Sequence, residues 1–112
     1  MLYIVSTPIG NLGDITYRAV EVLKDVDLIA AEDTRHTRIL CRHYDVQTPL
    51  TSYFEHNKVH KAQHLLKLLQ EGKKIALVTD AGTPGISDPG YHLIRLAKMH
   101  HIEMTAVPGV TA

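Results

Sequence analysis

Residues 75–90 read IALVTDAGTPGISDPG, and this stretch decides the fold class. It opens with an apolar run over 75–78 and continues into a loop rich in glycine, proline and aspartate. An uninterrupted apolar run of this length is typical of a parallel strand, because helices cover both of its faces. The loop after such a strand lies at the carboxyl edge of the sheet, where α/β proteins bind ligands. The stretch therefore predicts a buried strand that ends in a ligand-binding loop.

Similar apolar runs recur along the chain, with helical patterns between them. They lie at 2–5, 28–31 and 104–107, with a weaker one at 50–53. The segments between them carry apolar residues three and four positions apart, as amphipathic helices do. The order predicts a doubly wound α/β domain with a mainly parallel five-stranded sheet and helices on both faces. The apolar positions of the predicted helices are Ala19, Val20, Leu23 and Val26, then Ile39 and Leu40 within 34–43, then Ala62, Leu65, Leu66 and Leu69, and finally Leu93, Ile94 and Ala97.

Capping residues support these helix boundaries. Asp14 or Thr16 is expected to cap the first helix, because short polar side chains accept hydrogen bonds from the free amides of a first turn. Asp88 followed by Pro89 indicates another helix start. Gly72 is expected to end the third helix, because glycine readily adopts the left-handed conformation found there.

Composition narrows the class of protein. The 112 residues correspond to a single domain. The 12 Lys and Arg residues balance the 12 Asp and Glu residues, so overall charge gives no signature of nucleic-acid binding. The lone Cys41 excludes an internal disulfide and a zinc ribbon. The chain shows no secretory signal and no apolar run near the roughly 20 residues that span a bilayer, so we expect a cytoplasmic protein without membrane contact.

The segments that leave the predicted strands share one character. STPIGNLGD at 6–14, DAGTPGISDPG at 80–90 and PGVTA at 108–112 combine glycine and proline with hydroxyl residues, so a ligand can approach their backbone closely. None carries the GxGxxG fingerprint or the Lys-Ser/Thr ending of a phosphate loop. Each loop alone has the composition of an ordinary turn. Three of them at one sheet edge favour a site for one small molecule.

Four motifs, STPIGNLGDIT, AAEDTRHTRIL, VTDAGTPGISDPG and VPGVTA, follow one another along the chain. In this order and spacing they resemble the N-terminal domain of the tetrapyrrole methylase superfamily, and within it the bacterial branch that methylates ribosomal RNA. The resemblance implies S-adenosylmethionine as cofactor and transfer of its methyl group to a cytidine 2′-hydroxyl of 16S rRNA in the small ribosomal subunit. It also implies that residues 1–112 are the N-terminal half of a two-domain enzyme, inactive without the C-terminal domain. We further expect a homodimer of the full-length protein.

The resemblance also assigns cofactor-binding residues. Position 83 separates two branches, because many relatives that methylate tetrapyrroles carry Gly-Asp-Pro where this chain has Gly82-Thr83-Pro84. That difference favours the RNA branch. Asp80 is expected to add negative charge beside the sulfonium of the cofactor. The other residues that the resemblance places at the cofactor are Ile9, Gly10, Ala81, Gly82, Thr83, Ile86, Ser87, Thr111 and Ala112.

Catalytic candidates come from the loop after the second predicted strand. A ribose hydroxyl is a weak nucleophile, so a group that accepts its proton is expected nearby. Glu32 and Asp33 could act as this base, and Arg35 could hold a phosphate. In the alternative interpretation Asp33 or Thr34 caps the second helix and Arg35 is only solvated.

Basic residues and histidines suggest two further roles. Arg35, Arg38 and Arg42, with His36 and His43, make the second helix locally positive, which fits either RNA phosphates or an ordinary solvated face. The histidines at 56, 60 and 64 have helical spacing, but no further ligand completes a set, so we expect no metal. Cys41 is interpreted as a packing residue.

Two other functions remain open from the sequence. One is C-methylation of a uroporphyrinoid by an enzyme of the same superfamily. The other is a non-catalytic domain that keeps the cofactor fold. Transfer of a labelled methyl group to ribosomal subunits or to a uroporphyrinoid separates the two enzymes.

Overall fold

The computed structural model describes residues 1–8, 12–80 and 88–108. Within these ranges strands and helices alternate as the sequence predicts, and a short 3-10 helix η1 follows the first loop. The elements are β1 (Leu2–Thr7), η1 (Leu12–Asp14), α1 (Tyr17–Asp25), β2 (Leu28–Ala31), α2 (Thr34–His43), β3 (Leu50–Ser52), α3 (Lys58–Gln70), β4 (Ile75–Asp80), α4 (Asp88–Met99) and β5 (Met104–Val107).

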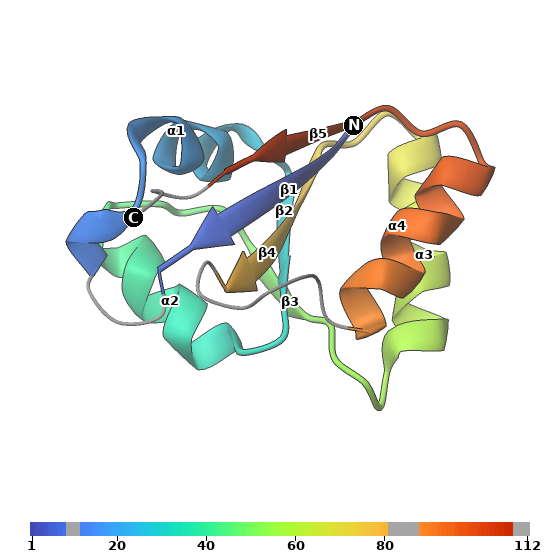
Figure 1. The fold of residues 1–112 in the computed structure, drawn as a ribbon, viewed down its shortest axis with the longest axis horizontal. Coiled ribbons are helices and arrows are strands. Elements are labelled where there is room, and N and C mark those ends of the chain that lie inside the picture. The colour runs from blue at the N-terminus through green and yellow to red at the C-terminus, as the bar shows by residue number, and fades with distance from the viewer. Residues whose placement is uncertain (9–11, 81–87, 109–112) are drawn as a thin grey trace.

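The strands of the described residues form one five-stranded sheet in the order β3-β2-β4-β1-β5 (Figure 1). All of the strand pairs are parallel, with Val5 opposite Val78 in the β1–β4 pair and Ala30 opposite Leu77 in the β2–β4 pair. The predicted doubly wound parallel sheet is therefore confirmed. The apolar run at 75–78 lies in the central strand β4.

Helices cover both faces of this sheet, with α1 and α2 on one face and α3 and α4 on the other (Figure 1). Alternate residues of β4 point to opposite faces. Ala76 is buried against α1 and α2, whereas Ile75 and Leu77 are buried against α3 and α4. This two-sided burial explains why the strand sequence is apolar throughout instead of alternating.

The topology places a switch point at the carboxyl end of β4. After β1 and β2 the chain enters the helices of one face, and after β4 it enters a helix of the other face. In the sheet order β3-β2-β4-β1-β5, the connections after β1 and β2 lead toward the β3 edge, whereas the connection after β4 leads toward the β5 edge. Ligands of open α/β sheets bind at such a switch point.

The predicted helix boundaries agree with the structure where it describes them. Thr16 caps α1, because its Oγ1 accepts a hydrogen bond from the Ala19 amide at 3.1 Å. Gly72 follows the end of α3 with a φ of +90°, a conformation that disfavours any residue with a side chain. The cap predicted for the side chain of Asp88 lies outside the described part of the structure. None of the described helices is long and apolar enough to cross a membrane.

The side of α3 that packs against the sheet allows a test of the fold. Leu65 is completely buried under the sheet, whereas Val59 of the same helix is 62% exposed. Leu65→Ala is expected to lower the free energy of unfolding by about 2–5 kcal/mol, because it removes apolar contacts and leaves a cavity. Val59→Ala is the matched control and is expected to change it by less than about 0.5 kcal/mol. Urea unfolding measures both, and equal stability of the two variants would contradict this packing.

Candidate functional site

The carboxyl edge of the sheet brings the ends of three central strands together. β1 ends at Thr7, directly opposite Asp80 at the end of β4. Thr7 is buried, and its hydroxyl donates to the Thr79 carbonyl oxygen at 3.3 Å, so a side chain also ties the two strands together. β2, on the other side of β4, ends at Ala31, and Glu32 follows it. The loops that the sequence identified therefore start from neighbouring strands.

Most predicted cofactor residues lie outside the described part of the structure. Of Asp80 the structure describes the backbone within β4. The assignment of these residues therefore stays a prediction, and the structure informs it through the segments that flank the loops. Outside the described ranges lie Ile9, Gly10, Ala81, Gly82, Thr83, Ile86, Ser87, Thr111 and Ala112.

Helix α2 holds both ends of the first loop. The carbonyl oxygen of Pro8 accepts a hydrogen bond from His36 Nε2 at 2.9 Å. Just after the loop, the carbonyl oxygen of Leu12 accepts one from the Tyr44 hydroxyl at 2.5 Å. A carbonyl can only accept, so His36 carries a proton on Nε2 in this arrangement. Residues 9–11 are therefore flanked by two anchors, one from the first turn of α2 and one from Tyr44, the residue that caps its C-terminal end.

A buried tyrosine holds the far end of the loop after β4. Tyr53 follows β3 and is completely buried, and its hydroxyl donates to the carbonyl oxygen of Pro89 in the first turn of α4. Burial raises the pKa of Tyr53 to about 12, so the phenol keeps its proton. The near end of the loop is held by the pairing of β4 with β1. The sequence did not predict the anchoring contacts of Tyr53, His36 and Tyr44, because their partners are distant in the chain.

Two catalytic candidates, Glu32 and Asp33, lie between β2 and α2, and the third, Arg35, lies in the first turn of α2. Asp33 caps α2, since its Oδ1 accepts from the amides of Arg35 at 3.1 Å and His36 at 3.2 Å. The capping interpretation of Asp33 is thereby confirmed. The side chains of Glu32 and Arg35 are exposed. Among the described residues neither Glu32 nor Arg35 takes part in an ion pair.

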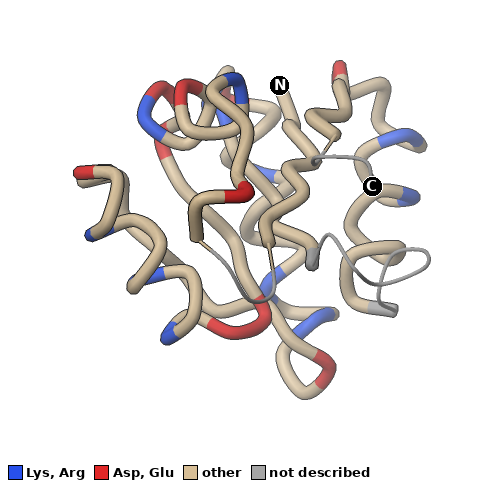
Figure 2. Tube along the Cα trace, turned by 60° about the vertical axis from the view of Figure 1, so that its left-hand side comes forward, with Lys and Arg blue, Asp and Glu red and all other residues tan. Residues whose placement is uncertain are grey.

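The outer side of α2 is strongly basic. Arg35, Arg38 and Arg42 are all exposed, and their spacing of three and four places them on one side of the helix. In Figure 2, where α2 is the helix at the lower left, basic positions follow one another along its outer side. Cys41 is buried on the opposite side, where burial raises the pKa of its thiol. Its interpretation as a packing residue is confirmed.

Histidines do not assemble into a metal-binding set in the described ranges. His60 and His64 are exposed on α3. Nowhere among the described residues do three His, Cys, Asp or Glu side chains come together as ligands.

The chain belongs to the family of Tetrapyrrole (Corrin/Porphyrin) Methylases, whose family model matches residues 1–112. Two curated relatives, from Synechocystis and from Escherichia coli O157:H7, are each 58% identical, over 112 and 111 residues. A relative from Mycoplasmopsis pulmonis is 51% identical over 111 residues. Each is named "Ribosomal RNA small subunit methyltransferase I". The chain covers 40%, 39% and 50% of the length of these relatives, and they align with 99–100% of it.

Solved structures share the fold at low sequence identity. A uroporphyrin-III-C-methyltransferase from Thermus thermophilus matches 98% of this chain with a TM-score of 0.72 and 20% identity. The cobalt precorrin-4 methyltransferase CbiF matches 98% with a TM-score of 0.75 and 21% identity. The chain covers 47% and 46% of those chains. The likeness confirms the α/β fold expected from the resemblance.

The Tyr53 anchor can be tested through stability and its dependence on pH. Tyr53→Phe leaves the Pro89 carbonyl without this partner and is expected to lower the free energy of unfolding by about 1–3 kcal/mol at pH 7. Because its pKa of about 12 in the folded chain lies above the ordinary value of about 10, the contribution of Tyr53 is complete below pH 10 and is lost between pH 10 and 12. Tyr53→Phe should therefore lose less stability over that range than the parent.

Tyr17→Phe is the control, because Tyr17 is 92% exposed. The free energy of unfolding of Tyr17→Phe, measured with urea, is expected to equal that of the parent protein from pH 7 to pH 12. Equal stability of the two phenylalanine variants at pH 7 would show that the Tyr53 hydroxyl does not anchor α4.

Proposed function

We propose that this chain is part of an S-adenosylmethionine-dependent methyltransferase that methylates a cytidine 2′-hydroxyl of 16S rRNA in the small ribosomal subunit. The observation that carries the proposal is the 51–58% identity, along nearly the whole chain, to relatives named as ribosomal RNA small subunit methyltransferases. The second domain of the enzyme, a homodimeric assembly and a cytoplasmic location remain predictions of the same hypothesis.

The described edge of the sheet fits this cofactor. The cofactor carries its methyl group on a positively charged sulfur, which favours nearby oxygen acceptors. The carboxylate of Glu32 is exposed at the switch-point edge, beside the end of β2. The anchored loops are rich in glycine and proline, so their backbone amides and carbonyls can hold an amino-acid group. We therefore place the methyl donor at this edge, with residues 9, 10, 80–83, 86, 87, 111 and 112 around it.

The arrangement at the start of α2 suggests a role for each of the residues Glu32, Asp33 and Arg35. In methyl transfer to a hydroxyl, the attacking oxygen, the methyl carbon and the sulfur of the donor must lie on one line. The hydroxyl must also lose its proton to a base. We assign proton acceptance to Glu32, because its carboxylate has no ion pair among the described residues. Asp33 uses one carboxylate oxygen to cap α2, so we propose it as a positioning residue and as the second candidate for the base. Arg35 can grip a phosphate of the RNA.

The arginine side of α2 extends this phosphate contact. It starts at Arg35, three positions after the proposed base in the chain, and continues through Arg38 to Arg42. A nearly neutral protein that binds RNA needs a local concentration of positive charge. We propose that the RNA backbone follows this helix away from the reacting ribose.

A uroporphyrinoid substrate is the second candidate, and the likeness to uroporphyrin-III-C-methyltransferase favours it. Only the shared fold supports a uroporphyrinoid substrate, because the sequence identity to this methyltransferase is 20%. In the deciding experiment, the full-length enzyme that contains this chain is incubated with tritium-labelled S-adenosylmethionine. One reaction contains small ribosomal subunits and the other contains uroporphyrinogen. Label in the subunit RNA supports our proposal. Label in the porphyrinoid, or in neither substrate, overturns it.

The assignment of Glu32 and Arg35 predicts a selective loss of activity. Glu32→Gln and Arg35→Ala in the full-length enzyme are each expected to lower methyl transfer to subunits at least about tenfold, or about 1.4 kcal/mol of transition-state stabilisation. Cofactor affinity, measured by calorimetry, should stay nearly unchanged. Glu21→Gln and Arg18→Ala on exposed positions of α1 are matched controls. If Glu32→Gln transfers methyl groups at the parental rate, Glu32 is not the base.

The RNA contact of α2 predicts a change in salt dependence. The probe is a fluorescein-labelled single-stranded RNA, and anisotropy gives its affinity for the 112-residue chain. Arg38→Gln with Arg42→Gln removes two phosphate contacts, so the slope of log K against log salt should fall by about 1.4. Arg18→Gln with Arg95→Gln changes charge equally on α1 and α4 and should leave the slope unchanged. Identical slopes for both double variants would exclude α2 as the RNA contact.

A further inference from the structure

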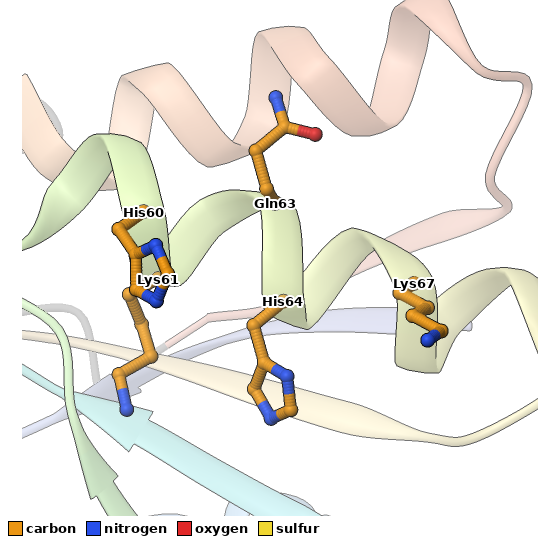
Figure 3. A pocket seen from close by; sticks show the side chains of 5 residues that line it. All are labelled: His60, Lys61, Gln63, His64 and Lys67. Atoms are coloured by element: carbon orange, nitrogen blue, oxygen red, sulfur yellow. The ribbon is translucent and has the colours of Figure 1, made fainter.

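The outer side of α3 carries a second basic feature, away from the proposed transfer site. A hollow of about 430 Å³ lies there, lined by His60, Lys61, Gln63, His64 and Lys67. Figure 3 shows the side chains of His60, Lys61 and His64 on the same side of the helix. None of these residues belongs to the loops or to the α2 side described above.

Helical spacing produces this arrangement. Ala62, Leu65, Leu66 and Leu69 form the buried stripe of α3, so the polar residues between them face outward. His60, His64 and Lys67 are four and three positions apart and therefore share one side. From Lys58 to Gln70 the helix contains no acidic residue. The lining thus offers cations and neutral polar groups without a carboxylate.

The charges of the hollow are not neutralised within the described structure. Lys58, at the start of α3, pairs with Glu55 at 2.9 Å and lies outside the lining. Lys61 is half-buried, and its ammonium donates to the neutral hydroxyl of Thr51 in β3 at 2.9 Å. Lys67 is exposed and has no ion pair among the described residues. Two uncompensated ammonium groups therefore remain, and one of them is held in place at the edge of the sheet.

The chemistry of the lining decides among ligand classes. A metal ion needs three or four protein ligands, and no such group occurs in the described ranges. The lining side chains all end in polar or charged groups, and the apolar part of the wall consists of their aliphatic and ring carbons, so an apolar ligand would leave these polar groups unpaired. Phosphate oxygens match ammonium and imidazole N–H donors. An open hollow along a helix also suits an extended chain of phosphates.

We propose that this hollow binds phosphates of the RNA backbone, as a second contact in addition to the arginine side of α2. The proposal rests on the proposed function for the identity of the nucleic acid. Strand β3 lies between the two contacts, since α2 packs on one face of the sheet and α3 on the other. RNA that touches both would pass around the β3 edge of the domain.

Salt-dependent RNA binding by the 112-residue chain tests the hollow directly. The variant Lys61→Gln with Lys67→Gln is compared with Lys24→Gln with Lys98→Gln, which removes equal charge from exposed positions of α1 and α4. The first variant is expected to lower the slope of log K against log salt by about 1.4 and to weaken binding roughly 25-fold at 0.1 M salt, if affinities converge at 1 M. The control should retain the parental slope, and urea unfolding verifies that both variants fold.

The possible outcomes separate this proposal from the proposed function. Equal slopes for the two lysine variants overturn the α3 contact, and the proposed function stands if Arg38→Gln with Arg42→Gln still weakens binding. If the parent chain binds no RNA, both RNA contacts fail, whereas methyl transfer by the full-length enzyme tests the function separately. Stoichiometric zinc binding that His60→Gln with His64→Gln abolishes would make the hollow a metal site and overturn the proposal.

Discussion

The pairing of β1 with β4 is the constraint on which the rest of the structure depends. It runs from Leu2 opposite Ile75 to Thr7 opposite Asp80 and joins segments far apart in the chain. Closing so long a loop is entropically unfavourable, and burial of apolar side chains on both sheet faces offsets it. The same register aligns the ends of the two strands, so the loops that follow them start side by side. The position of the candidate site is thus a consequence of strand pairing in the core.

Helix α2 connects this core to the proposed chemistry. Its first turn is fixed by Asp33, its buried side packs against the sheet, and His36 and Tyr44 hold the segments around the first loop. These hydrogen bonds fix the backbone on each side of residues 9–11 relative to α2. Glu32 lies between the end of β2 at Ala31 and the cap residue Asp33, so its backbone is positioned from both sides. One helix therefore lies next to both the proposed base and the two segments that flank residues 9–11.

The fold could be predicted from the sequence because its signals are local. Apolar runs and helix caps such as Thr16 depend on neighbours in the chain, and the limits of α2 agree with the predicted 34–43. The sheet order and the anchors on Pro8, Leu12 and Pro89 depend on contacts between distant residues. Tyr53 illustrates the difference, because its sequence neighbours predict a strand and give no sign of its partner in α4. The cofactor residues came from a family resemblance, and the local pattern alone indicated only a ligand-binding edge.

The short edge strand β3 has a consequence for association between copies of the chain. An edge strand presents backbone groups that can pair with a strand of another molecule, and proteins resist this with short edges and with lysine. β3 is 3 residues long, and the ammonium of Lys61 lies against Thr51 in its middle. An incoming strand would have to bring that charge close to its own backbone and displace its hydration. Lys61 therefore also acts as a gatekeeper against edge-to-edge aggregation of the sheet.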